Sequence, residues 1–212
     1  MTGVPTVGAT RPPTRLKGAP EALEEQGYAV LPRAVPPERV AGALRLLNLE
    51  IARSGIDPSQ VPHLQQSTFF PHLRWNGEVW DLLPVAAESL IRQSPEDEWG
   101  EAQLLLRFPD EATSWPLSPH VDELPPWAAE RSYRGVVGVA LTPAGPEDGC
   151  LRVWPGSHRG QPADPVPVPL GPGDVVVMHP LLGHSGGLNR GASIRMSVYF
   201  RLISCAEGAR DA

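Results

Sequence analysis

The stretch that decides the fold is residues 173–202, which reads GDVVVMHPLLGHSGGLNRGASIRMSVYFRL. A Gly-Asp turn leads into the apolar run at 175–179, which is short, rich in valine and typical of a buried strand. The run at 194–202 alternates between two kinds of side chain, as a strand with two different faces does. Gly186 and Gly187 mark a turn between them. This stretch therefore predicts two strands with histidines in the connection.

Similar short apolar runs precede this stretch, and glycine–proline turn signals separate them. They predict strands at 103–108, 117–122, 134–142, 151–154 and 166–170. Many short strands at regular spacing are typical of an all-β sandwich or barrel. No helix-length pattern lies between them, which disfavours a parallel α/β sheet. The second half of the chain is therefore expected to be mainly β.

The first half of the chain has helical patterns instead. Apolar side chains spaced by three or four predict a helix at 39–53. A short helix is also expected at 19–26, ended by Gly27, and one or two helices within 79–93, interrupted at Pro84. The expected organisation is one structural domain overall with three parts. These are a disordered tail (1–18), a helical N-terminal lobe (19–100) and a β catalytic core (101–205).

Composition narrows the possible partners. The 18 basic and 24 acidic residues give a net charge of −6, and no basic run exists to hold a phosphate backbone, so nucleic acid is excluded as a main partner. No membrane span is expected, because no run of 18 apolar residues occurs. The two cysteines, Cys150 and Cys205, and the lack of an apolar leader predict a cytoplasmic protein. Monomer and homodimer both stay open.

His120 and Asp122 form the first half of a possible metal site. Residues two apart in a strand point to the same face, so an imidazole and a carboxylate would lie side by side. One distant histidine completes a set of two histidines and one carboxylate, which leaves open positions on Fe(II). His184 and His179 are both candidates for that third ligand.

Arg195 is the second unusual feature, because it is a charged residue on the inner face of the predicted strand at 194–202. A buried guanidinium is costly unless an anion accompanies it, and its planar fork fits a carboxylate. Ser197 shares that face and offers a hydroxyl donor. The pair predicts a carboxylate-binding position.

These motifs together resemble the phytanoyl-CoA dioxygenase family. The residues that carry the resemblance are His120-x-Asp122, LRVWPGSH at 151–158, Gly173-Asp174, His184-Ser185-Gly186, Asn189 and Arg195-x-Ser197. The resemblance covers about residues 103–202. It implies a double-stranded β-helix, which is a jelly-roll or cupin-like barrel, and an Fe(II) centre held by His120, Asp122 and His184. It also implies that Arg195, helped by Ser197, binds the co-substrate 2-oxoglutarate, with O₂ as the oxidant.

The resemblance implies hydroxylation of an unactivated C–H bond in a small molecule, such as a natural-product or amino-acid-type intermediate. Asp122 favours this outcome, because related halogenases have a small residue at that position. Desaturation, epimerisation or cyclisation at the same iron centre is an alternative. A cupin-type metal isomerase or hydrolase, or a non-catalytic binding barrel, is a second alternative.

Other residues are candidates for binding. Gln103 shares a strand face with Arg107, and we expect Gln103 to contact the co-substrate or the substrate. Arg107, Trp115 and Trp154 are candidate substrate contacts. The loop at 123–132 is interpreted either as a lid or as an ordinary connector.

Overall fold

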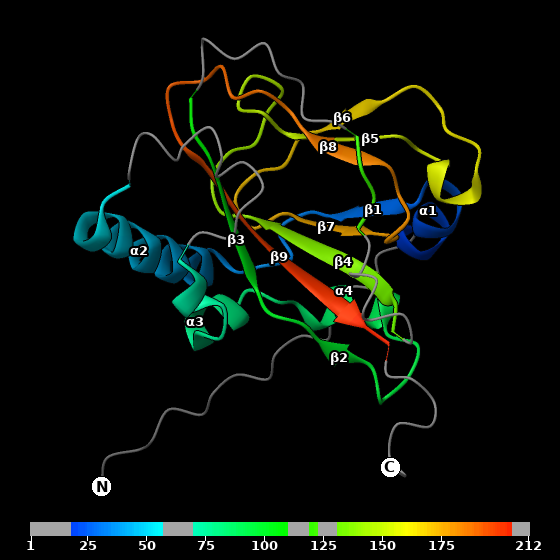
Figure 1. The fold of residues 1–212 in the computed structure, drawn as a ribbon, viewed down its shortest axis with the longest axis horizontal. Helices are drawn as coiled ribbons and strands as arrows, with labels where there is room; N and C mark the ends of the chain where they lie inside the picture. Colours follow the sequence, from blue (N-terminus) through cyan, green and yellow to red (C-terminus); the bar gives the residue numbers. More distant parts are fainter. Residues whose placement is uncertain (1–17, 57–69, 110–118, 123–130, 205–212) are drawn as a thin grey trace, which may run out of the picture.

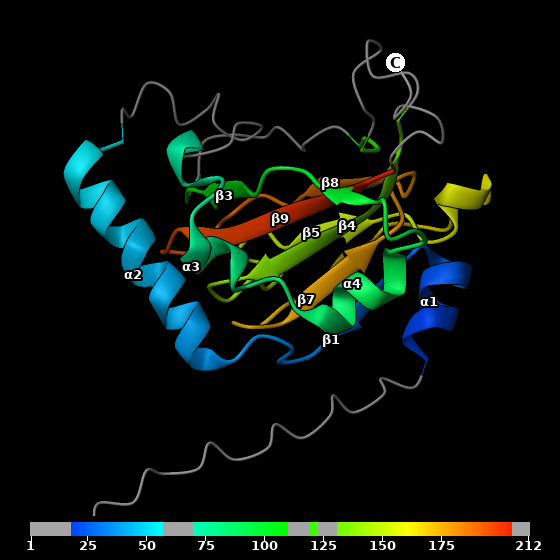
Figure 2. The same ribbon diagram turned by 90° about the horizontal axis from the view of Figure 1, so that it is seen from below.

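The computed structural model describes residues 18–56, 70–109, 119–122 and 131–204. The tail predicted at 1–18 lies outside the described residues except for Gly18. The described chain is layered, with helices on one face of a six-stranded sheet and a three-stranded sheet beyond the other face (Figures 1 and 2). Within the described residues, no helix is long and apolar enough to cross a bilayer.

The six-stranded sheet is antiparallel throughout and has the order β1-β7-β4-β9-β2, with β3 also paired to β9. Its strands are β1 (Tyr28–Leu31), β2 (Glu98–Trp99), β3 (Gln103–Arg107), β4 (Tyr133–Ala140), β7 (Val175–Met178) and β9 (Arg195–Ile203). Every residue of β7 is buried, as expected for a valine-rich strand covered on both faces. The predicted mainly β architecture is confirmed, and its sheets are antiparallel.

The three-stranded sheet has the order β6-β5-β8 and is also antiparallel. Its strands are β5 (Leu151–Val153), β6 (Val166–Val168) and β8 (His184–Gly186). The sequence did not predict β8, because Gly186 indicated a turn and His-Ser-Gly has little β propensity. Pairing with β5 imposes the extended conformation. An apolar cluster that includes Val136, Val176 and Val153 fills the space between the two sheets.

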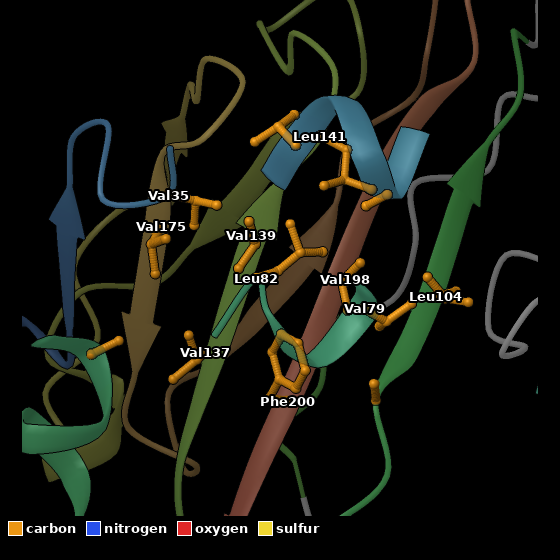
Figure 3. Packing of buried hydrophobic residues seen from close by; sticks show 14 of the residues in the cluster. Val35, Val79, Leu82, Leu104, Val137, Val139, Leu141, Val175, Val198 and Phe200 are labelled. Atoms are coloured by element: carbon orange, nitrogen blue, oxygen red, sulfur yellow. The ribbon is translucent and has the colours of Figure 1, made fainter. Parts of the chain in front are cut away.

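The helices cover the other face of the six-stranded sheet. They are α1 (Ala19–Gln26), α2 (Pro37–Ser54), α3 (Gly77–Trp80) and α4 (Val85–Ile91), with the 3-10 turn η2 (Pro71–Leu73). A second 3-10 turn, η4 (Ser157–Arg159), lies between β5 and β6 in the chain. Val40, Ala43 and Leu47 form the buried side of α2. Figure 3 shows Val79 and Leu82 packed with Val137, Val198 and Phe200 of the sheet.

The predicted helical N-terminal lobe is not confirmed as a separate unit. Strand β1 belongs to the same segment of chain, yet it pairs with β7 inside the six-stranded sheet. The helices and that sheet also share one apolar cluster. The physical reason is that the apolar side of α2 needs a large apolar partner, and the sheet face provides it.

Gly135 on β4 allows α4 to approach the sheet closely. A Cβ atom at this position would lie 2.7 Å from Cγ2 of Ile91, which is too close for real atoms. The β4–β9 register also shifts between Tyr133 and Gly135. The helix and the strand therefore meet at a point where the chain has no side chain.

Asp97 anchors the connection between α4 and β2. Asp97 is buried, with only 3% of its surface exposed. One carboxylate oxygen accepts the backbone N–H groups of Gln93 and Ser94, each at 2.9 Å, and the other accepts Nε of Arg134 at 3.2 Å. Burial alone would raise the pKa of Asp97, but the Gln93 and Ser94 N–H groups and Arg134 together lower it below its ordinary value.

We predict that Asp97→Asn lowers the free energy of unfolding at neutral pH by about 1–3 kcal/mol, because an amide cannot satisfy all three donors. A depressed folded-state pKa stabilises the protein above the ordinary value of 3.8 and stops doing so as pH falls through the folded-state value. The difference between wild type and variant should therefore shrink in acid. Urea unfolding over a pH series measures it, with exposed Asp164→Asn as the control. A difference that stays constant with pH would contradict the assignment.

Candidate active site

The backbone brings the HxD segment next to β8. Of the strand predicted at 117–122, the structure describes residues 119–122. His120 and His184 exchange two backbone hydrogen bonds, at 3.0 and 2.9 Å, and the N–H of Asp122 donates to the carbonyl of Pro180 at 3.0 Å. As a result, the His120 and His184 rings lie 4.4 Å apart, and Nε2 of His184 lies 3.7 Å from Oδ2 of Asp122. The three predicted metal ligands are thus neighbours.

The His184 ring is oriented by its own backbone. Its Nδ1 lies 3.0 Å from the carbonyl oxygen of Leu182. A carbonyl can only accept, so Nδ1 donates and the neutral ring keeps its lone pair on Nε2, the atom nearest Asp122. Burial lowers the pKa of His184, against the opposing effects of the Leu182 carbonyl and the Asp122 carboxylate. A neutral imidazole whose second nitrogen donates to a carbonyl is the usual form of a metal-binding histidine.

The carboxylate of Asp122 is held by Arg201 through the oxygen that is not nearest His184. Its side chain is 10% exposed, and its Oδ1 accepts hydrogen bonds from Nε and Nη2 of Arg201, at 3.1 and 2.8 Å. The other oxygen, Oδ2, is the one nearest Nε2 of His184. His184 is therefore held through Nδ1 and Asp122 through Oδ1, while Nε2 of His184 and Oδ2 of Asp122 lie toward each other.

The fit of this set to a metal ion depends on small movements. Among the described residues, no group of three or more His, Cys, Asp or Glu side chains already stands at metal-holding distances. Ligand atoms around one ion lie about 3 Å apart, given metal–ligand bonds of about 2.1 Å. The 3.7 Å between Nε2 of His184 and Oδ2 of Asp122 would have to shorten by less than 1 Å. The donor types are those of the facial triad.

Arg195 and Ser197 lie on the face of β9 that is directed toward the three-stranded sheet, and both are buried, at 6% and 8% exposure. The Arg195 guanidinium donates to the carbonyl of Gly149. Its Nε and the Ser197 hydroxyl have no hydrogen-bond partner within the described part of the chain. Buried donors of this kind are costly unless a ligand satisfies them. A carboxylate placed here would accept from both.

A small cavity lies beside these two donors. It has a volume of about 10 Å³, close to the space of one water molecule, so a carboxylate would have to displace its walls. Its lining includes Leu151, Leu170, Gly138 and Tyr199. A Cβ at Gly138 would lie 2.6 Å from the Tyr199 ring. The glycine therefore leaves room for that ring at the edge of the cavity.

A larger pocket, of about 340 Å³, opens at the other end of β9 beside Asp122. Its lining is formed by Gly100, Glu101, Gln103, Asp122, Tyr133, Arg201 and Ile203. Oε1 of Gln103 accepts NH1 of Arg201 at 2.7 Å. Burial raises the pKa of Tyr133, so its hydroxyl stays protonated at neutral pH and can donate. Polar groups therefore converge in this pocket, next to the candidate ligands.

Arg201 and Tyr133 are site residues that the sequence analysis missed. The signal for Arg201 was present, because residues 195, 197, 199 and 201 alternate onto one face of the same strand. Only Arg195 and Ser197 of that face were predicted as binding residues. Tyr133 carries no comparable pattern, since it becomes part of the pocket only through the pairing of β4 with β9.

The other predicted contacts fall in different places. Gln103 reaches the larger pocket, as described above. Arg107 is buried on β3 directly opposite Arg195. Trp154 is half-buried, its backbone N–H donates to Gly183, and it lines neither of the two pockets described here. Trp115 and most of the loop at 123–132 lie outside the described residues.

His179, the competing ligand candidate, faces a different group. Its ring packs against that of His158 at 5.0 Å, and its Nδ1 accepts the backbone N–H of Leu181 at 3.1 Å. Burial, and then the neighbouring His158, lower its pKa. His158 in turn contacts the Glu24 carbonyl at the end of α1. This histidine pair ties η4 to α1 and leaves His184 as the histidine beside Asp122.

Solved structures share this fold. SnoK, a non-haem alpha-ketoglutarate-dependent carbocyclase from nogalamycin biosynthesis, superimposes with a TM-score of 0.69 at 20% identity, over 97% of this chain and 92% of that chain. SnoN, a non-haem alpha-ketoglutarate-dependent epimerase from the same biosynthesis, gives 0.61 at 22% identity, over 89% and 82%. The chain therefore shares its fold with these two enzymes.

The family match is carried by the β half of the chain. Residues 104–197 match the family model described as Phytanoyl-CoA dioxygenase (PhyH), and this match confirms the predicted resemblance. The dioxygenase trt7 of Aspergillus terreus (strain NIH 2624 / FGSC A1156) is 31% identical over 139 residues. That match covers 58% of this chain and 47% of the relative, so the chain spans about half the length of this relative.

We predict that His184→Ala lowers the affinity for a divalent metal by at least about 100-fold, because the Nε2 that faces Asp122 is lost. The matched variant His179→Ala should bind the metal as the wild type does, since His179 contacts His158 instead. Calorimetric titration of the anaerobic apo-protein measures both, and circular dichroism checks the fold. Equal losses in the two variants would show that the assignment of the third ligand is wrong.

Proposed function

We propose that this protein is an Fe(II)- and 2-oxoglutarate-dependent oxygenase built on a double-stranded β-helix. His120, Asp122 and His184 bind the iron, and Arg195 with Ser197 binds the distal carboxylate of 2-oxoglutarate. The observation that carries the proposal is the convergence of two imidazoles and one carboxylate, with His184 and Asp122 oriented by other groups. The buried Arg195 Nε and Ser197 hydroxyl, on a strand next to that set, support it.

The bound iron, with 2-oxoglutarate and O₂, supplies an oxidant able to cleave a C–H bond, while CO₂ and succinate are released. The protein residues position these components. Three ligands on one side leave the remaining coordination positions for co-substrate and oxygen. Arg195 fixes the far end of the co-substrate, and the apolar walls around it exclude water. The Leu182 carbonyl keeps the His184 ring in the tautomer that can bind metal.

The substrate proposed is a small molecule, of the natural-product or amino-acid type. The pocket beside Asp122, of about 340 Å³, has the size of a small-molecule site. Gln103, Glu101 and Tyr133 offer it hydrogen-bonding groups. The favoured outcome is hydroxylation, because Asp122 occupies the position that a halide would need in a halogenase.

We predict a visible metal-to-ligand charge-transfer band when the apo-protein is titrated anaerobically with Fe(II) and 2-oxoglutarate. Arg195→Ala should still bind iron but should need roughly 30-fold or more 2-oxoglutarate for half of the band. Loss of a buried contact to a charged ligand costs about 2–5 kcal/mol, and each 1.4 kcal/mol is tenfold. Absorbance titration measures both quantities.

Asp122→Ala is the control, because without this carboxylate the band should not form. Iron binding without a band in the wild type would favour a cupin-type isomerase or hydrolase. A wild type that binds no metal would favour a binding barrel. An unchanged 2-oxoglutarate requirement in Arg195→Ala would refute the role of that arginine.

Cyclisation and epimerisation at the same centre form the second candidate function. The likeness to a carbocyclase and to an epimerase favours keeping both outcomes under test. The triad itself does not choose between them, because all these outcomes begin with removal of a hydrogen atom from the substrate. The choice depends on how the substrate is held afterwards.

We predict that turnover under ¹⁸O₂, with a substrate identified by succinate release, places one ¹⁸O atom in the product, as hydroxylation requires. Desaturation or cyclisation would instead give a product two hydrogens lighter without label, with the second oxygen atom leaving in water. Epimerisation would give an unlabelled product of unchanged mass. Mass spectrometry after chromatography that resolves the epimer from the substrate separates the three outcomes, and either unlabelled product would overturn the hydroxylase proposal while leaving the cofactor assignment intact.

A further inference from the structure

Arg201 makes the most extensive side-chain contacts in the candidate site. Nε and NH2 both donate to Oδ1 of Asp122, at 3.1 and 2.8 Å, and NH1 donates to Oε1 of Gln103 at 2.7 Å. The side chain is 22% exposed, and its guanidinium lies 6.0 Å from the Tyr133 ring centroid. All three guanidinium nitrogens are thus engaged, and two of them bind a single oxygen of a proposed iron ligand.

We propose that Arg201 is the positioning residue of the metal centre, which rests on the proposed function. It holds Oδ1 of Asp122 so that Oδ2 is the oxygen presented to the metal. A free carboxylate can bind a metal through one oxygen or through both. Occupying Oδ1 with two N–H donors favours binding through one oxygen, which keeps the other coordination positions open for co-substrate and O₂.

The geometry of the guanidinium explains why an arginine is needed. The planar guanidinium directs two N–H groups of one edge onto the single oxygen Oδ1 of Asp122, and a third nitrogen, Nη1, donates to Gln103. A lysine has the same charge but presents a compact ammonium that fixes no such angle. Gln103 fixes the arginine from the side of the pocket, so the order of contact runs from Gln103 to Arg201 to Asp122.

A competing role would be charge compensation alone. Asp122 is only 10% exposed, and Arg201 neutralises it when no metal is bound. In that case Arg201 would compete with the metal for Asp122, and its removal would strengthen metal binding. The positioning role predicts the opposite sign, because loss of a group that orients a ligand typically weakens metal affinity 10–100-fold. The sign of the change therefore separates the two roles.

The test is a titration of the full-length apo-protein with Co(II), whose visible spectrum reports the number and arrangement of the ligands. The variants are Arg201→Met, Arg201→Lys and Gln103→Leu. Arg152→Met is the matched control, because Arg152 is an exposed arginine on strand β5. Circular dichroism and thermal unfolding verify that each variant folds.

We expect Arg201→Met to weaken Co(II) binding about 10–100-fold and to change the spectrum. Arg201→Lys should not restore the wild-type spectrum, Gln103→Leu should have a smaller effect of the same sign, and Arg152→Met should behave as wild type. Unchanged or tighter binding in Arg201→Met, or a wild-type spectrum in Arg201→Lys, overturns the inference. If Arg201→Met does not fold, Arg201→Lys and Gln103→Leu decide by the same criteria.

Failure of the proposed function gives a different result. A wild-type protein that does not bind Co(II), or an Asp122→Ala variant that binds it as the wild type does, refutes the metal centre and the role of Arg201 with it. If the wild type binds Co(II), Asp122→Ala does not, and Arg201→Met equals the wild type, only the role of Arg201 is refuted.

Discussion

The two faces of strand β9 are the constraint on which the rest of the structure depends. On one face Met196, Val198, Phe200 and Leu202 belong to the apolar cluster shared with the helices. The other face carries Arg195, Ser197, Tyr199 and Arg201 in alternation. A shift of register by one residue would place two arginines in the apolar cluster. The energy of packing the apolar face therefore also fixes the direction of every polar group on the other face.

The register of β9 is set by three neighbours at once. β4 pairs along its length, while β3 and β2 pair with its other edge. This arrangement places Gln103 near Arg201, and Tyr133 beside the same pocket. The HxD segment reaches the site differently, through the two backbone hydrogen bonds between His120 and His184. Thus the central strand β9 carries the proposed binding groups, and the HxD segment together with β8 carries the proposed metal ligands.

The sequence predicted the strands well where burial alone determines them. The apolar runs that became β3, β7 and β9 were predicted within one or two residues, because their periodicity records which faces are buried. Strand β8 was missed, since its His-Ser-Gly sequence is extended only by pairing with β5. The helical N-terminal lobe was also not confirmed, because local periodicity shows that a helix has an apolar side without showing what covers it.

The sequence likewise indicated some residues of the candidate site but not the contacts that the fold creates between distant segments. His120, Asp122 and Arg195 could be proposed from the sequence itself, because strand alternation and a buried charge leave marks in it. The preference for His184 over His179 came from the family resemblance. The contact of Arg201 with Asp122 joins residues 79 positions apart and depends on the packing of three segments. Such contacts leave no local pattern. Alternation along β9 could have placed Arg201 on the correct face, but it could not have named its partner.

The two arginines of β9, Arg195 and Arg201, differ in whether a carboxylate of the described chain pairs with them, and this difference favours one orientation of a bound dicarboxylate. Arg201 has all three guanidinium nitrogens engaged by Asp122 and Gln103, so it is neutralised by the protein itself. Arg195 is more deeply buried, and its Nε has no hydrogen-bond partner within the described part of the chain. Because a buried guanidinium needs a counter-anion, the end of the strand at Arg195 favours an incoming anion, while the end at Arg201 does not. A dicarboxylate would therefore enter with its distal carboxylate toward Arg195 and its other end toward the histidines and Asp122.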